Sequence, residues 1–120
     1  MGRKNVFVID DELQVQNLFS EALSRHGHIV SCASDGESAI NKLEGVKPDV
    51  IFLDLKLPGM NGVQTLEGIR KLHPKVPVVI ITAYPRDSLV DGAMRLGVFA
   101  CLVKPFSMMD VNTILETMDL

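Results

Sequence analysis

The chain of 120 residues has no tryptophan and only one tyrosine, and its basic residues form no block. Twelve Lys and Arg residues stand against fifteen Asp and Glu, which gives a formal net charge of −3. Proteins that bind nucleic acid usually show a clustered basic patch, and many add aromatic side chains that stack on bases. We therefore expect this chain to make no direct contact with nucleic acid.

Long hydrophobic runs are also missing. The first apolar run is short and ends in three acids, so it does not resemble a signal peptide. No uninterrupted apolar run is long enough to span a membrane. Cysteine is scarce, and Cys32 and Cys101 form no CxxC pair, so we interpret both as small core residues rather than as a disulfide. These absences predict a soluble cytoplasmic protein without membrane insertion.

The length fits one domain that buries most of its surface in a single core. We find no linker, internal repeat or low-complexity segment, and we expect one domain over residues 1–120.

Two patterns alternate along the chain. Short apolar, β-branched runs predict strands at residues 5–9, 28–33, 49–53, 76–82 and 98–103. The clearest helical stripe comprises Val15, Leu18, Phe19, Ala22 and Leu23; Val111, Ile114, Leu115 and Met118 repeat it, and residues 36–44, 63–72 and 86–96 show weaker helical spacing. Five strands alternating with five helices indicate a doubly wound α/β fold, a parallel sheet with helices on both faces. The continuous apolar character of the central strands agrees with burial on both sides.

Local signals mark where the predicted helices end and begin. Gly27, Gly45 and Gly97 each follow a helical run, where a left-handed C-terminal cap is favoured. Ser107 with Asp110 three residues later indicates a variant of the capping box at the start of the last helix.

Charged and hydroxyl side chains gather where the predicted strands end. The first strand is followed by Asp10, Asp11 and Glu12, the third by Asp54, the fourth by Thr82, and the fifth by Lys104 and Pro105. In a doubly wound sheet the ligand site lies beyond the carboxyl ends of the strands. At an effective dielectric of about 20, two like charges about 4 Å apart repel by roughly 4 kcal/mol. Carboxylates gathered there would take up protons or recruit a cation.

A hard divalent cation suits such a set of oxygen ligands. Mg²⁺ takes one or two carboxylates and leaves room for waters and phosphate oxygens. No His or Cys lies at these strand ends, which argues against zinc. Each residue alone has an ordinary structural explanation: Asp11 or Glu12 as a favourable charge at a helix start, Asp54 as a turn residue, Lys104 as a solvated end. Their joint placement at one sheet edge favours a functional site.

Four motifs carry a family resemblance: "VIDDE", "DVIFLDLKLPGMNG", "VVIITAY" and "CLVKPF". In this order and spacing, the chain resembles the receiver domain of two-component response regulators over nearly its whole length. It looks most similar to stand-alone phosphorelay regulators of the sporulation type. The resemblance implies one flavodoxin-like receiver domain, with the parallel strands in the order 2-1-3-4-5.

The resemblance also implies a phosphoacceptor and a metal site. Asp54 would accept a phosphoryl group from a histidine of a sensor kinase or of a phosphotransfer protein. Asp11, Asp54 and the backbone carbonyl of Lys56 would coordinate Mg²⁺ or Mn²⁺, and Asp10 would act on the metal mainly through water. We interpret Glu12 as a charge favouring the first helix rather than as a ligand.

The remaining implied roles concern the response to phosphorylation. Thr82 would hydrogen-bond a phosphoryl oxygen, and Lys104 would pair with Asp54 at rest and bind the phosphoryl group afterwards. The Lys104–Pro105 peptide bond would be cis. Chemistry supports these roles, because a carboxylate can hold an acyl phosphate and cations stabilise the transferring oxygens. The conformational switch would control an output partner that the sequence leaves unnamed.

Three further positions are expected to modulate this behaviour. Lys56 and Tyr84 would hinder an attacking water and give a long-lived phosphorylated state. Cys101 stands where many family members carry an aromatic switch residue, and its small side chain cannot give the same rotamer signal. With Phe99 it suggests an apolar face, formed by the fourth and fifth helices and the fifth strand, for a partner or a phosphorylation-dependent dimer. The alternative, that a helix covers Phe99, stays open.

Two other classes of protein compete with this interpretation. Phosphohydrolases with an aspartate nucleophile use an Asp-x-Asp-x-Thr loop, but Leu55, Lys56 and Leu57 follow Asp54 without a second acid. A nucleotide or flavin binder would place a glycine-rich loop after the first strand, where this chain has the acidic run "DDELQV". We therefore expect a signalling module that catalyses only its own phosphorylation and dephosphorylation.

Overall fold

A computed structural model describes residues 2–118 of the chain. Within these residues, five strands alternate with five helices. The elements are β1 (Asn5–Ile9), α1 (Leu13–Ser24), β2 (Ile29–Ala33), α2 (Gly36–Leu43), β3 (Val50–Asp54), α3 (Gly62–Leu72), β4 (Val78–Thr82), α4 (Ser88–Arg95), β5 (Ala100–Val103) and α5 (Met108–Met118). Each of the five strands predicted from apolar runs is present, with ends shifted by at most two residues.

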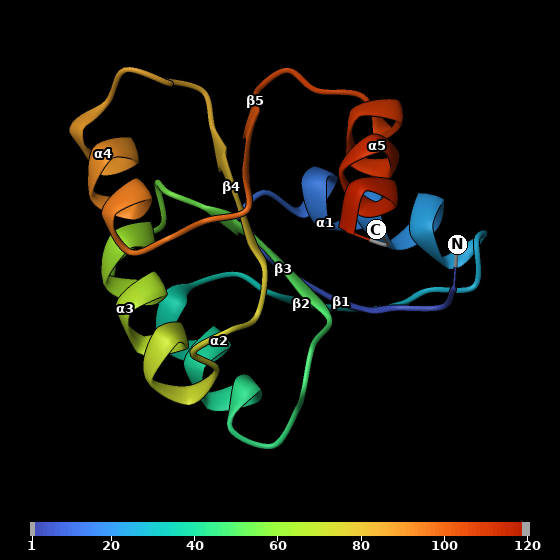
Figure 1. The fold of residues 1–120 in the computed structure, drawn as a ribbon, viewed down its shortest axis with the longest axis horizontal. Coiled ribbons are helices and arrows are strands. Elements are labelled where there is room, and N and C mark those ends of the chain that lie inside the picture. The colour runs from blue at the N-terminus through green and yellow to red at the C-terminus, as the bar shows by residue number, and fades with distance from the viewer. Residues whose placement is uncertain (1, 119–120) are drawn as a thin grey trace.

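The strands form one parallel sheet in the order β2-β1-β3-β4-β5. Helices α1 and α5 cover one face of this sheet, and α2, α3 and α4 cover the other (Figure 1). Every residue of β3 and β4 is buried, because these strands have a neighbour on each side and helices above and below. The predicted doubly wound α/β fold is therefore confirmed, including its strand order.

The core consists of two apolar layers, one on each face of the sheet. Alternate residues of a strand enter opposite layers: Ile51 packs toward α2, α3 and α4, and Phe52 packs toward α1 and α5. Phe19 of α1 meets Phe52 with ring centroids 4.8 Å apart. These layers fix the strands rigidly, so the residues at their carboxyl ends are held in defined positions.

The local signals were mostly interpreted correctly. Ser107 and Asp110 form the expected reciprocal cap, with N–H to side-chain oxygen distances of 3.0 and 3.3 Å. Gly27 and Gly97 have the positive φ of a left-handed cap, 84° and 83°. The same prediction for Gly45 is wrong, because among the described residues positive φ occurs only at Gly27, Gly97 and Gly59. The C-cap residues of α1, α2 and α4 all have right-handed geometry, and only after α2 does no left-handed glycine follow.

The two cysteines are free thiols, and Cys32 is half-buried. The interpretation of Cys101 as a core residue is wrong, because it lies exposed on the edge strand β5. Phe99 is also 43% exposed, so the alternative that a helix covers it is wrong. Between residues 2 and 118, no helix has both the length and the apolar character needed to cross a membrane.

Candidate functional site

Three acidic side chains meet beyond the carboxyl ends of β1 and β3. Carboxylate oxygens of Asp10, Glu12 and Asp54 all lie within 4.8 Å of one another. Asp10 and Glu12 come from the loop between β1 and α1, and Asp54 is the last residue of β3. The predicted gathering of acids at one edge of the sheet is thus present.

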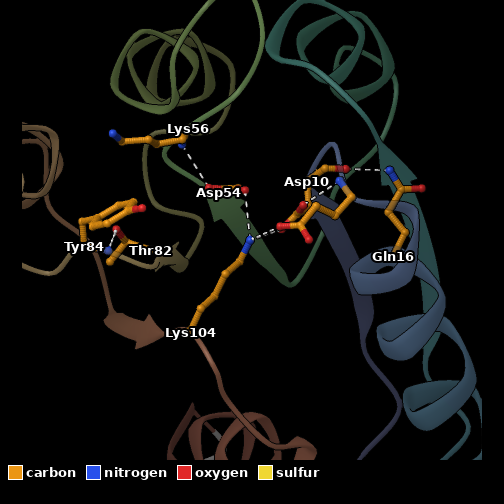
Figure 2. A network of polar contacts seen from close by, with 8 residues as sticks. Asp10, Gln16, Asp54, Lys56, Thr82, Tyr84 and Lys104 are labelled. Carbon is orange, nitrogen blue, oxygen red and sulfur yellow. Dashed lines mark hydrogen bonds and ion pairs between the residues drawn. The ribbon is translucent and has the colours of Figure 1, made fainter.

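The ammonium group of Lys104 lies among these acids. The Lys104 Nζ atom is 2.7 Å from Glu12 Oε1, 3.4 Å from Asp54 Oδ2 and 3.5 Å from Asp10 Oδ2 (Figure 2). Burial lowers the pKa of Lys104, but the hydrogen bond to Glu12 and the charges of the acids outweigh burial, and the net shift is upward. The lysine therefore stays charged, and the expected ion pair with Asp54 is present. The Lys104–Pro105 bond is cis, as the resemblance implied.

Asp10 is the most deeply buried of the three acids, with no exposed surface. Its Oδ1 accepts the backbone N–H of Glu12 at 2.8 Å, whereas its Oδ2 accepts no hydrogen bond from any described residue. Burial raises the pKa of Asp10 to about 6; the Glu12 N–H and the Lys104 charge oppose this rise, and the charges of Asp54 and Glu12 add to it. An ionised Asp10 is thus poorly compensated by the protein alone.

The loop that carries these acids is fastened by Gln16 of α1. Its Nε2 donates to the backbone carbonyl of Asp10 at 2.6 Å and to Ser34 Oγ at 3.1 Å. Figure 2 shows this amide reaching across to the Asp10 backbone. Sequence reasoning missed this role, since no motif distinguishes Gln16 from the other polar residues of the helix.

The structure adds to the interpretation of the other two acids in the loop. Glu12 is the N-cap residue of α1, but its side chain makes no capping hydrogen bond and instead meets Lys104. Glu12 thus lies at the helix start, as the interpretation requires, and its carboxylate also pairs with Lys104; its effect on the helix stays a prediction. Asp11 is exposed and lies outside the close group of carboxylates, although it lines the same cavity of about 290 Å³. Its role as a direct metal ligand stays a prediction.

Asp54 is only 5% exposed, and both of its carboxylate oxygens have a partner. Oδ1 accepts the backbone N–H of Lys56 at 3.0 Å, and Oδ2 faces Lys104 at 3.4 Å. These contacts fix the carboxylate at the wall of the cavity that Asp11, Glu12 and Lys104 also line.

The fourth strand places Thr82 at the same edge, where it is buried. Its Oγ1 accepts the backbone N–H of Tyr84 at 3.0 Å, and its carbonyl accepts the N–H of Lys104 at 2.8 Å. The Tyr84 ring is mostly exposed, and the Lys56 ammonium lies 5.0 Å from its centroid. Sequence reasoning did not single out Asp87, whose carboxylate lies 3.3 Å from the same ammonium.

A family model for the response regulator receiver domain matches residues 6–116. The chain belongs to this family, whose members are phosphoryl-accepting signalling modules of two-component systems and not ordinary turnover enzymes.

Particular relatives agree with this assignment. The chain is 36% identical to the alkaline phosphatase synthesis transcriptional regulatory protein PhoP of Bacillus subtilis (strain 168), over 91% of the chain and 45% of PhoP. It is 26% identical to sporulation initiation phosphotransferase F of the same organism, over 93% of the chain and 90% of that protein. The crystal structure of the receiver domain of NtrX from Brucella abortus is 31% identical and superposes with a TM-score of 0.86, over 95% of this chain and 97% of that one. The chain therefore spans less than half of PhoP but nearly all of the sporulation protein.

Proposed function

We propose that Asp54 accepts a phosphoryl group from a phosphohistidine of a sensor kinase or of a histidine phosphotransfer protein in the cytoplasm. The observation that carries this proposal is the placement of Asp54, a buried carboxylate held between the Lys56 N–H and the Lys104 ammonium at a cavity wall. A conformational change that follows phosphorylation would then control an output partner.

The covalent step needs an oxygen nucleophile and cations around the phosphorus. A carboxylate oxygen of Asp54 forms the new bond to phosphorus while the bond from phosphorus to the donor atom breaks, and the electron pair leaves with the donor. Lys104 already faces Asp54 and can neutralise an oxygen of the transferring group without a large movement. Thr82 Oγ1, held at the same edge, would donate its hydroxyl hydrogen to a phosphoryl oxygen.

The cluster of three carboxylates suits a hard divalent cation. Three carboxylates share one ammonium, and Asp10 Oδ2 accepts no hydrogen bond from the described residues. We assign Asp11, Asp54 and the Lys56 carbonyl as direct ligands of Mg²⁺ or Mn²⁺ and Asp10 as a contact through water; the position of Glu12 adds a further carboxylate within reach. When bound, the cation supplies positive charge that stabilises the phosphoryl oxygens.

Loss of the phosphoryl group would be slow. The side chains of Lys56 and Tyr84 flank the cavity beside Asp54 and would hinder a water approaching the phosphorus. Lys56→Ala and Tyr84→Ala are expected to speed hydrolysis of the phosphorylated protein. The loss of a radiolabelled phosphoryl group from the protein over time measures this rate. If both variants match wild type, the hindrance idea is wrong.

An apolar face would receive the output partner or a second copy of the chain. Met94 of α4, Phe99, Val103 of β5 and Met109 of α5 are all exposed, and so is Cys101 of β5. Light scattering with and without beryllofluoride tests the dimer form of this idea. A monomer in both states would leave only a different protein as the partner.

The central experiment is phosphorylation by acetyl phosphate in the presence of Mg²⁺, read by the mass of the intact protein. Wild type is expected to gain one phosphoryl group, and Asp54→Asn is expected to gain none. A wild-type protein without an adduct, or an adduct on Asp54→Asn, would overturn the proposal. Assays for turnover of small phosphate esters and a flavin absorption spectrum separate it from the two competing classes.

A further inference from the structure

The backbone of Lys56 lies beside Asp54, but its side chain points away from the Asp54 carboxylate (Figure 2). Its backbone N–H donates to Asp54, but its Nζ is 3.3 Å from Asp87 Oδ2 and 5.0 Å from the centroid of the Tyr84 ring. Figure 2 shows the lysine extending from its amide toward Tyr84 rather than toward the Asp54 carboxylate. The side chain is 56% exposed, so more than half of its surface is open to solvent.

Asp87 links this lysine to the start of α4. It is the N-cap residue of that helix, and its Oδ1 accepts the backbone N–H of Leu89 at 2.9 Å. Its other oxygen faces Lys56, and its own N–H donates to the Tyr84 carbonyl at 3.0 Å. The Leu89 N–H and the Lys56 ammonium together lower the pKa of Asp87, so the carboxylate is ionised at neutral pH. One carboxylate thus ties α4 both to its own first turn and to the loop after β3.

A phosphoryl group on Asp54 would compete with Asp87 for the Lys56 ammonium. It adds about 1.5 to 2 negative charges and strong acceptor oxygens. Lys56 lines the same cavity as Asp54 and is only two residues away along the chain. Ion pairs with an exposed lysine are weak, because water screens them and the long side chain loses freedom when it is fixed. The resting pair is therefore easy to break in favour of a stronger anion.

We propose that Lys56 is a second phosphoryl-binding cation and that Asp87 is a positioning residue that holds it aside at rest. On phosphorylation Lys56 moves from Asp87 to a phosphoryl oxygen, and the start of α4 loses its link to the loop after β3. This inference rests on the proposed role of Asp54. It gives α4 a way to respond to phosphorylation that does not need an aromatic side chain at Cys101.

A double-mutant cycle on the lifetime of the phosphorylated protein tests the exchange. Asp87→Asn retains an oxygen that can cap α4 but removes the charge that competes for Lys56. Asp87→Asn is expected to lengthen the lifetime of the phosphorylated protein by about two- to fivefold. This is the fold-change that the free energy of a solvent-screened ion pair corresponds to. In a Lys56→Met background the same change is expected to have no effect. Asp35→Asn is the matched control, because Asp35 caps α2 through the Ser38 N–H without a role at the site.

Hydrogen exchange gives a readout in wild type that a purely structural role of Asp87 would not produce. With beryllofluoride and Mg²⁺, the amides of Leu89 and Val90 are expected to exchange faster than in the resting protein. In Lys56→Met the acceleration should be absent, because no ammonium leaves Asp87.

The outcomes separate this inference from the function on which it rests. Three results would overturn the movement of Lys56 from Asp87 to the phosphoryl group while the Asp54 adduct still forms. They are equal effects of Asp87→Asn in both backgrounds, no effect in either background, and unchanged hydrogen exchange at the start of α4. Absence of any adduct on wild type would remove the function of Asp54 and the exchange together.

Discussion

The two sides of Asp54 each present a lysine, but they differ in burial and in the number of charges. On one side Lys104 is 21% exposed and contacts three carboxylates at 2.7 to 3.5 Å. On the other side Lys56 is 56% exposed and contacts the single carboxylate of Asp87 at 3.3 Å. Similar distances thus join groups in very different surroundings.

This difference shows that the distance between two charged groups does not by itself decide how strongly their ion pair stabilises the protein. Around Lys104 the carboxylates of Asp10 and Asp54 are removed from water, so their mutual repulsion and their attraction to the ammonium are weakly screened, whereas Glu12 is 55% exposed. The Lys56 side chain is 56% exposed and that of Asp87 is 23% exposed, so water screens this pair more than the pair of Lys104 with Asp54, and its formation and loss change the free energy little. The first side is suited to hold a cation and a phosphoryl group in place, and the second is suited to rearrange.

Removal of the buried lysine should have the largest effect on stability. Lys104→Met leaves three carboxylates without their counter-ion and is expected to lower the free energy of unfolding by about 3 kcal/mol at pH 7 without metal. Urea denaturation measures this, and added Mg²⁺ should restore part of the loss. Lys42→Met is the control, because Lys42 is an exposed lysine whose Nζ donates to the Cys32 carbonyl at 2.7 Å, away from the three carboxylates. Equal midpoints for the two variants would show that the site's charges are not coupled to folding.

Neutralising the buried acid should act in the opposite direction. The pKa of Asp10 is raised from 3.8 to about 6, so its ionised form opposes folding at neutral pH. Asp10→Asn is expected to raise the free energy of unfolding at pH 7 by up to about 3 kcal/mol. The same change should weaken Mg²⁺ binding by about 10- to 100-fold, measured by calorimetry. A destabilised Asp10→Asn protein would contradict the assignment of Asp10 as a poorly compensated charge.

The pH dependence of the metal-free protein follows from the same group, with a smaller effect. Between about pH 6 and pH 4 the folded protein holds a proton on Asp10 and the unfolded chain does not, so stability rises as the pH falls. From pH 7 to pH 5 the gain from this group should be about 1 kcal/mol. The difference between wild type and Asp10→Asn in denaturation at each pH isolates it. Saturating Mg²⁺ should abolish the rise; an identical pH profile for both proteins would refute it.

The exposed side should show the smallest effect on stability. Lys56→Met is expected to leave the midpoint of urea denaturation unchanged, because the Lys56 side chain is 56% exposed and its ion pair with Asp87 is screened by water. Its effect should appear only in the lifetime of the phosphorylated state. A loss of stability comparable to that of Lys104→Met would mean that the two sides of Asp54 do not differ as the structure indicates.

Much of the fold and the location of the site follow from patterns within short stretches of sequence. Alternation of apolar runs with helical spacing is enough to predict the doubly wound sheet, since buried parallel strands and their covering helices have different periods. Once the sheet is predicted, the strand ends bring Asp10, Asp54, Thr82 and Lys104 to one edge. The Ser107 cap was also predictable, because both of its partners lie within one helical turn.

Predictions failed where the outcome depends on distant neighbours. Gly45 lacks the left-handed conformation although the helix before it ends in the same right-handed C-cap geometry as the helices before Gly27 and Gly97, because a glycine permits positive φ but does not dictate it. Cys101 is exposed because β5 lies at the edge of the sheet and is left partly uncovered. Neither fact is visible in the residues beside it.

The sequence by itself therefore determined the class of fold, the family and the residues that gather beyond the sheet, because these depend on period, order and spacing. Only the tertiary structure decided how the charges are shared: Glu12 bonded to Lys104, Asp10 buried with an oxygen that accepts no hydrogen bond from the described residues, and Lys56 drawn to Asp87. The physical reason is that the free energy of a charge depends on its distance to other charges and on its exposure to water. Both quantities are set by segments far apart in the chain.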